Sequence, residues 1–387
     1  MEVNKTVPSP SPFSGLDATL FDNYPILTSI LVCLVFTMIL ITLVGNVLVC
    51  LTVFLVRKLK QQPANFLLVS LAFADLGVAL FVMPPALLLL FKGSWVLGSA
   101  ACQLWTSADL TLCTASILNL CMICIDRYMA VIDPLRYVVA RTSKRILIYI
   151  AIVWIGAFFV SIAPVTVLPL RNIEDTCQVP QNSFYQIYAT LIAFYLPTII
   201  MVTLYVRMLL VASRICKQDR HTHCAHSEST LAKPEEFDRK KSIKKLHRPS
   251  ALLTVVKVQL LSAHSSFKGE NKARKTLGVI MSVFICCWLP FFILALVKLR
   301  TSKIPMWLDY LALWLGYSNS MLNPLIYCKY NREFRIPFRE MLCCRFSTLQ
   351  TVMRHESFTN KFGPTRQQTP LIGDAKATQK LTQTSEM

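Results

Sequence analysis

Seven long apolar segments constrain the fold of this chain more than any other feature. A helix needs about 20 predominantly apolar residues to cross the hydrocarbon core of a bilayer. The composition also requires contact with lipid, because 54% of the residues are hydrophobic and 16% are charged, against roughly 25% charged in a soluble domain. The segments cover approximately 25–56, 65–91, 101–132, 146–169, 184–212, 275–298 and 307–328.

These segments predict an all-α membrane protein, a seven-transmembrane helix bundle over residues 25–345 with a short amphipathic cytoplasmic helix after span seven. The third and seventh spans are less apolar, so we expect them inside the bundle. The polar tails, residues 1–24 and 346–387, are expected to be disordered. Loop three, about 213–272, is expected to be flexible, with a short apolar run at 251–263 at the membrane surface.

The positive charges predict the orientation of the chain. The formal net charge is +19, and Lys and Arg gather in cytoplasmic loops of membrane proteins. Arg57, Lys58 and Lys60 follow span one, Arg141 and Lys144 follow span three, and loop three is also basic. We therefore expect an extracellular N-terminus and a cytoplasmic C-terminus. The charge reflects this topology, and we expect no binding of nucleic acid.

The cysteines and one sequon fit this orientation. Of the 14 cysteines, only Cys102 and Cys177 fall in predicted extracellular segments, where disulfides persist. A disulfide between them would tie the loop before span five to the outer end of span three. Cys343 and Cys344 lie just beyond span seven, where cysteines are often palmitoylated, although unmodified thiols are the alternative. Asn4 begins a sequon for extracellular glycosylation.

Charged residues within the spans indicate function, because a charge in hydrocarbon costs several kcal/mol. Asp109 and Arg127 are eighteen residues apart in span three, which is five helical turns and roughly 27 Å. They therefore lie on one face of the helix, near its outer and inner ends. Asp75 lies about ten residues into span two, near the midplane, and must be protonated, paired or hydrogen-bonded there.

Several motifs in register resemble those of rhodopsin-like (class A) G-protein-coupled receptors. They are Asp-Arg-Tyr at 126–128, Cys-Trp-Leu-Pro at 287–290 and Asn-Pro-Leu-Ile-Tyr at 323–327. The resemblance covers residues 24–345. It implies a plasma-membrane receptor that activates heterotrimeric G proteins by outward movement of span six. It further implies receptor kinases and arrestin as partners, membrane lipids around the bundle, and no enzymatic activity.

The resemblance also implies a switch near the cytoplasmic side. Arg127 would be held by Asp126 and Glu270 in the resting state, and Tyr205 and Tyr327 would stabilise the open state. The full set of expected switch residues is Asp126, Arg127, Glu270, Tyr205, Asn323, Pro324 and Tyr327.

Asp75 resembles the centre of the family's sodium site, which is the one bound ion that we expect; no other cofactor is expected. The residues assigned to it are Asp75, Ser116, Asn319 and Ser320, and Asn46 and Asn323 are further possible polar partners of Asp75. A purely structural polar network is the alternative. The amphipathic segment after Tyr327 would lie on the inner leaflet, although Pro337 counts against a continuous helix there.

The outer half of the bundle resembles the pocket of biogenic amine receptors. Asp109 would pair with a cationic ligand among aromatic rings. The expected ligand-binding residues are Asp109, Cys113, Thr190, Ala193, Trp288, Phe291, Phe292, Trp314 and Tyr317.

Span five separates the amines, because Thr190 offers one hydroxyl between Ala189 and Ala193. Catecholamine receptors place two or three serines there. A single partner resembles serotonin receptors, and the segments at 83–86 and 103–109 are similar to those of type 6 in particular. Receptors for dopamine, octopamine or tyramine are the alternatives.

Other classes fit less well. A transporter usually shows internal repeats or broken helices, and neither is apparent. A retinal protein would need a lysine within span seven, which has none. The segment HTHCAH at 221–226 has residues that bind metals, but it lies in a polar stretch and is better explained as solvated.

Overall fold

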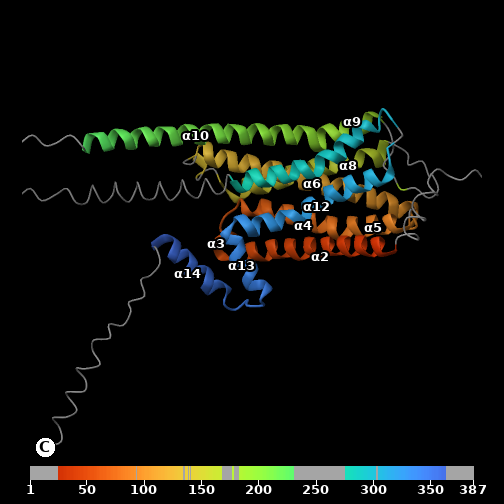
Figure 1. Cartoon of the computed structure of the whole chain (residues 1–387), viewed down its shortest axis with the longest axis horizontal. Coiled ribbons are helices and arrows are strands. Elements are labelled where there is room, and N and C mark those ends of the chain that lie inside the picture. The colour runs from red at the N-terminus through yellow and green to blue at the C-terminus, as the bar shows by residue number, and fades with distance from the viewer. Residues whose placement is uncertain are drawn as a thin grey trace, which may run out of the picture. The chain divides into compact units, whose positions relative to one another are not determined.

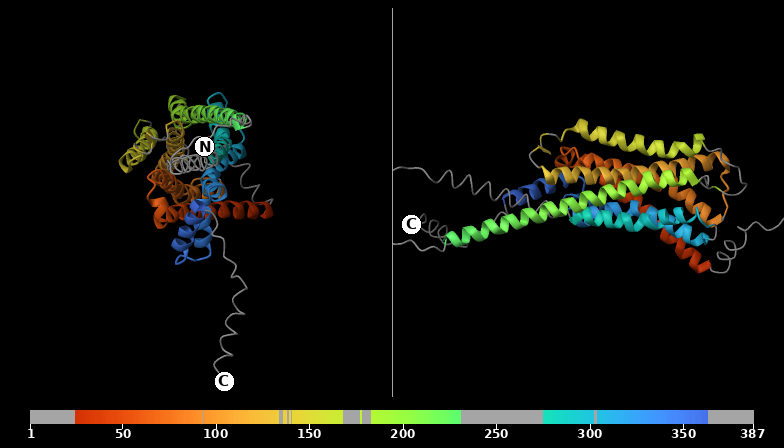
Figure 2. Two further views of the ribbon diagram at one scale, coloured as in Figure 1. Left: turned by 90° about the vertical axis from the view of Figure 1, so that its left-hand side faces the viewer. Right: turned by 90° about the horizontal axis from the view of Figure 1, so that it is seen from above.

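The computed structural model describes residues 25–92, 94–133, 136–137, 139, 141–167, 177, 183–230, 275–301 and 304–362. Seven helical segments in this part of the chain correspond to the predicted spans (Figures 1 and 2). Asn4, Glu270 and the apolar run at 251–263 lie outside the described residues.

The predicted spans agree closely with the helices. Their bounds are α2, Pro25–Leu55; α4, Asn65–Gly77, with η1, Val78–Val82, and α5, Met83–Lys92; α6, Gly98–Ile132; α8, Ser143–Val167; α9, Ser183–Thr190, with η2, Leu191–Tyr195, and α10, Leu196–Thr230; the helix Lys275–Val297; and α12, Met306–Tyr330. The short helix α3, Arg57–Lys60, connects α2 to α4. The prediction of a seven-helix bundle is therefore confirmed.

Helix α6 occupies the centre of the packing. It contacts α4, η1, α8, η2 and α10, whereas α2 packs on α4 and α12. Large apolar side chains on the other helices are exposed, including Leu34, Phe81 and Phe159. Such a surface requires a hydrocarbon solvent. The bundle thus buries its small and polar groups on α6 and turns its bulky apolar groups outward.

Span seven is the most polar of the spans. Six helices in the described part of the chain are both long and apolar enough to cross a membrane. Helix α12 is not one of them, although it has 25 residues, enough to cross by length. Its polar residues Asn319, Ser320 and Asn323 are all buried. An interior position explains its composition, as the sequence predicted.

Two spans contain a π-helical segment that the sequence did not predict. In η1 and η2 the hydrogen bonds follow an i→i+5 pattern over five residues each. Each segment inserts residues into an α-helix and rotates the faces that follow it. Hydrophobic periodicity is weak in spans that are apolar on all sides, so the pattern gave no sign of either change.

Helix α10 continues to Thr230, well past the predicted end of span five at 212. The flexible loop expected from about 213 therefore begins as a helix. The sequence has no Gly or Pro between Thr198 and Thr230, and Pro234 follows shortly after. Nothing in that stretch interrupts a helix, although its polar composition suggested a loop.

The C-terminal region is also more helical than expected. Residues 346–387 were expected to be disordered, but Leu349–Phe362 forms helix α14. Leu349, Val352 and Met353 follow helical spacing, and this signal outweighs the polar composition.

The expected short helix after span seven is present as α13, Arg332–Leu342, and it is continuous through Pro337. Proline has a helical φ and removes a single hydrogen bond, and packing of the first turn compensates for that loss. The ring of Phe334 lies 6.0 Å from that of Tyr327. Glu333 forms an ion pair of 2.5 Å with Lys58 of α3.

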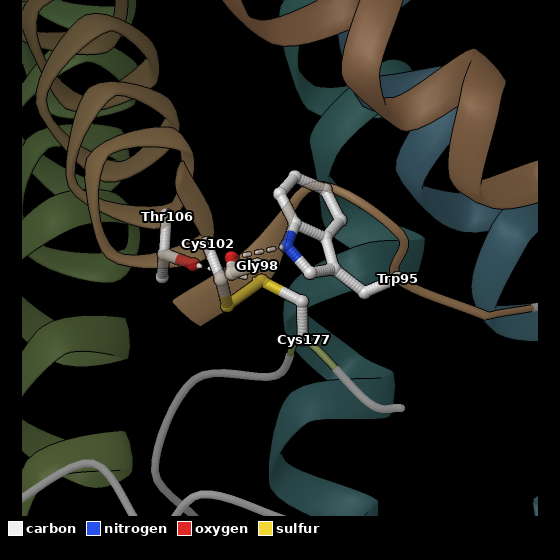
Figure 3. The surroundings of a disulfide bond; sticks show 5 residues. All are labelled: Trp95, Gly98, Cys102, Thr106 and Cys177. Atoms are coloured by element: carbon white, nitrogen blue, oxygen red, sulfur yellow. Dashed lines mark hydrogen bonds between the residues drawn. A yellow bond between two sulfur atoms is a disulfide. The ribbon is translucent and has the colours of Figure 1, made fainter. Parts of the chain in front are cut away.

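A disulfide joins Cys102 near the start of α6 to Cys177, with their Cα atoms 5.7 Å apart (Figure 3). The pairing predicted from the sequence is therefore confirmed. Thr106 lies one turn along α6, and its hydroxyl is 3.6 Å from the Cys177 sulfur. Trp95 donates from its indole nitrogen to the Gly98 carbonyl at 2.8 Å. These contacts order the outer end of α6.

We expect Cys102→Ser and Cys177→Ser to lower the melting temperature of the purified protein equally. The double variant should lose no more than either single variant, because one bond accounts for both effects. Thermal unfolding in detergent measures this, and Cys33→Ser, which removes an exposed free thiol, is the control. Additive losses would show that the two cysteines stabilise the protein separately.

Candidate functional site

Asp109 is the acidic group at the outer half of α6, and two neutral donors fix its position. Its Oδ1 accepts from the Tyr317 hydroxyl at 3.1 Å and from the Cys113 thiol at 3.3 Å. Tyr317 is fully buried and Cys113 is buried, whereas Asp109 is half-buried. No Lys or Arg of the described part of the chain pairs with this carboxylate. It is thus held in place with its charge uncompensated, as a site for a cation requires.

An aromatic cluster on the helix Lys275–Val297 lies in the same outer half of the bundle. The ring of Phe292 is 5.8 Å from that of Trp288 and 5.3 Å from that of Phe291. The Trp314 ring contacts Tyr317, the partner of Asp109, edge-on at 5.5 Å. Aromatic faces attract cations and stack on flat rings. The cluster therefore suits a ligand with a cationic end and an aromatic end.

Span five contributes one residue that the sequence analysis missed. Phe194 in η2 is fully buried and stacks on Phe292 at 4.4 Å, and its ring is 5.7 Å from that of Phe284. Thr190 and Ala193, which were predicted, are buried beside it in the chain. The sequence did place Phe194 one helical turn after the predicted Thr190, which was a sign that both share a face. The π-helical segment η2 changes the rotation of the helix there, so the face of Phe194 could not be read from spacing alone.

Asp75 is the centre of a second, deeper site formed by three helices. Its Oδ1 accepts from the hydroxyls of Ser116 at 2.9 Å and Ser320 at 2.8 Å. Its Oδ2 accepts from the Asn323 amide at 2.8 Å. Asn46 of α2 donates to the Ser320 carbonyl at 3.1 Å. The network joins α4, α6 and α12 directly, and α2 through Asn46.

The residues of this site fit a small hard cation. Asp75 is fully buried and supplies one negative charge, and the nearby Ser116 and Ser320 supply neutral oxygens. Asn319 is buried, and neither atom of its amide has a hydrogen-bond partner among the described residues. No group of three or more His, Cys, Asp or Glu that could hold a metal occurs in that part of the chain. Oxygen donors of low total charge suit a monovalent ion better than zinc.

The inner end of α6 carries the expected Asp–Arg pair. Arg127 lies 3.6 Å from Asp126 Oδ2, and Asp126 Oδ1 accepts from the Tyr137 hydroxyl at 2.7 Å. Sequence reasoning missed Tyr137, which lies in the loop after span three. Burial, together with the Asp126 charge, raises the pKa of Tyr137, so its hydroxyl remains a donor at neutral pH. Asp126 is therefore shared between a tyrosine and an arginine.

The family is shown by comparison with known sequences. The family described as 7 transmembrane receptor (rhodopsin family) matches residues 45–327. The chain belongs to this family.

Three relatives of the receptor are similar over most of its length. A protein named 5-hydroxytryptamine receptor 1 from Drosophila melanogaster is 40% identical, over 83% of this chain and 65% of the relative. The 5-hydroxytryptamine receptor 7 of Xenopus laevis is 35% identical, over 80% and 76%. The 5-hydroxytryptamine receptor 1B of Cricetulus griseus is 38% identical, over 81% and 86%. The receptor thus spans just under two thirds of the Drosophila relative.

The structure separates the two asparagines expected near Asp75. Asn323, expected in the switch and as a possible polar partner of Asp75, is bonded to Asp75, whereas Asn319, assigned to the sodium site, has no hydrogen-bond partner among the described residues. Both lie one turn apart on α12, so the sequence alone could not decide which of them faces Asp75. The buried hydroxyl of Tyr327 has no hydrogen-bond partner among the described residues.

Proposed function

We propose that this receptor binds serotonin at Asp109 and activates heterotrimeric G proteins. The observation that carries the proposal is the half-buried Asp109 carboxylate, fixed by Tyr317 and Cys113 without a positive partner. An ammonium ion would complete this site. The names of the three relatives support serotonin as the amine.

Span five supports serotonin over the other amines. Thr190 is buried and supplies one hydroxyl for the ring hydroxyl of serotonin, while Ala193 supplies a methyl surface for the indole. Phe194 and Phe292 stack beside them and extend the aromatic wall. A buried polar group without a partner costs roughly 1–3 kcal/mol. Dopamine would bring two ring hydroxyls to a wall with one partner.

Signal transfer would follow the family pattern. Outward movement of the helix Lys275–Val297 would free Arg127 from Asp126, and from Glu270 as a second partner, for contact with the G protein. We further propose receptor kinases and arrestin as partners, and an orientation in the plasma membrane with the N-terminus outside. We further propose stimulation of adenylyl cyclase, which the resemblance of the segments at 83–86 and 103–109 to type 6 receptors favours. Dopamine, octopamine and tyramine are the competing ligands.

The Asp75 network is proposed as an allosteric sodium site. Asp75, Ser116 and Ser320 would hold the ion, with Asn319 nearby to complete the oxygen set. Such an ion would stabilise the resting arrangement because it ties α4, α6 and α12 together. Glycosylation of Asn4 and palmitoylation of the exposed Cys343 and Cys344 are proposed as modifications.

Asp109→Asn should weaken serotonin binding by about 2–5 kcal/mol, as expected when one partner of a desolvated ion pair is removed. Surface expression should be retained, since the amide keeps the shape of the side chain. Binding of labelled serotonin to membranes measures the loss. The control is Asp309→Asn, because Asp309 forms an ion pair with Lys298 at 2.8 Å and is partly exposed. Equal binding by Asp109→Asn and wild type would contradict an amine site here.

Thr190→Ala should lower the potency of serotonin more than that of tryptamine, which lacks the ring hydroxyl. On the wild type, dopamine should be weaker than serotonin by tenfold to a hundredfold if about 1.4–2.7 kcal/mol is lost. Dose–response curves for serotonin, tryptamine, dopamine, octopamine and tyramine, with cAMP and calcium recorded together, test both points. If dopamine or octopamine acts at lower concentration than serotonin, the serotonin assignment is wrong and the amine assignment stands.

Sodium chloride should lower the affinity for serotonin in wild-type membranes by a few fold, because the ion favours the resting state. Asp75→Asn should remove this dependence, since it removes the only charge of the site. Choline chloride at equal ionic strength is the control for screening. A wild-type affinity that responds equally to both salts would show that Asp75 centres a structural network only.

A further inference from the structure

Gly278, near the start of the helix Lys275–Val297, lies directly against the ring of Tyr205 on α10. A Cβ atom at position 278 would lie 2.2 Å from the Tyr205 hydroxyl oxygen and 2.8 Å from its Cζ. Real Cβ atoms do not approach other heavy atoms so closely. Any side chain larger than hydrogen at residue 278 would therefore require the Tyr205 ring to move.

No backbone requirement explains a glycine at this position. Gly278 lies within a regular helix, and Gly98 is the only glycine of the described residues with a positive φ. Glycine in a helix interior costs about 0.5–1 kcal/mol relative to alanine. When a glycine destabilises its helix and the backbone conformation does not require it, close packing of a neighbouring group is the expected explanation. The contact with Tyr205 supplies such packing.

Among the helical glycines of the described residues this contact is the closest. At Gly45 a Cβ would lie 2.6 Å from a ring carbon of Pro324, and at Gly77 it would lie 2.7 Å from a methyl carbon of Leu112. At Gly156 a Cβ would meet only a methyl carbon of Leu118 at 3.4 Å, an ordinary contact. At Gly316 the nearest atoms are ring carbons of Trp288 at 2.9–3.3 Å. At Gly278 the closest atom is the far end of a tyrosine, which can rotate away. A methyl group there would displace the ring before it displaced either helix.

We propose that Gly278 forms the seat that holds Tyr205 in the resting arrangement, and is thus a positioning residue for the receptor's switch. This inference rests on the proposed function, in which span six moves outward, and on the expectation that Tyr205 stabilises the open state. The buried Tyr327 hydroxyl, which has no hydrogen-bond partner among the described residues, marks the other tyrosine of the switch. Loss of the seat destabilises the resting state and leaves the open state unchanged.

A double-mutant cycle in the purified receptor tests the seat itself. Gly278→Ala should melt about 2–4 °C below wild type, the shift expected for a loss near 1 kcal/mol. In a Tyr205→Ala background the same change should cause no fall, since no ring remains to be displaced. Gly156→Ala, a helical glycine with room for a methyl group, is the matched control and should not lower the melting temperature.

Basal signalling tests the consequence for the switch. At matched surface expression, Gly278→Ala should raise agonist-free G-protein activation by about threefold to tenfold, equivalent to 0.7–1.4 kcal/mol in the resting-to-open equilibrium. Gly156→Ala should leave it unchanged. The effect of Gly278→Ala should be absent in the Tyr205→Ala background.

The outcomes separate the seat from the proposed function. A fall in melting temperature of equal size with and without the Tyr205 ring would overturn the seat, and so would reduced basal activity in Gly278→Ala. If no amine activates the wild type, the proposed function fails, whereas the melting cycle still decides whether Gly278 positions Tyr205.

Discussion

The hydrocarbon core of the bilayer requires that each buried polar group find its partner within the protein. In this receptor the requirement is met at Asp75, whose carboxylate accepts from Ser116, Ser320 and Asn323. These donors lie on α6 and α12, so one acidic side chain fixes the register of three helices. A sliding movement of α12 by one turn would remove two of the three donors, those of Ser320 and Asn323, and leave only Ser116 of α6. Loss of partners for a buried charge is costly. The packing of the remaining helices depends on this arrangement.

Helix α6 connects the two ends of the molecule as a single rigid element. Asp109 lies in its first half and Arg127 near its C-terminal end, and three other spans pack along it. A change at Asp109 would pass through neighbouring helices that present alternative packings, and the aromatic rings of the helix Lys275–Val297 are the nearest candidates. In close-packed proteins a change at one site generally reaches another when packed elements switch between discrete arrangements.

The sequence predicted the elements of the structure better than their contacts. Span boundaries followed from apolar length, and the disulfide followed from topology, because both depend on one property of long segments. The Asp75 network could be predicted only in part, since Asn319 and Asn323 are one turn apart and the choice between them depends on helix rotation. Phe194 was missed because η2 changes the rotation of span five. Helices α14 and the end of α10 were missed because polar composition was given more weight than the spacing of apolar residues.

Glycine shows most clearly what the three-dimensional contacts add. In the sequence Gly45, Gly278 and Gly316 are indistinguishable from Gly156, but their surroundings differ. The first two lie against side chains of the expected switch, Pro324 and Tyr205, and Gly316 lies against Trp288 of the expected ligand site, each within 3.0 Å of an ideal Cβ. Gly77 lies as closely against Leu112, which is not an expected switch residue. Close packing at glycine thus limits where a neighbouring side chain can lie, and it bears on the switch only where that neighbour is itself a switch residue.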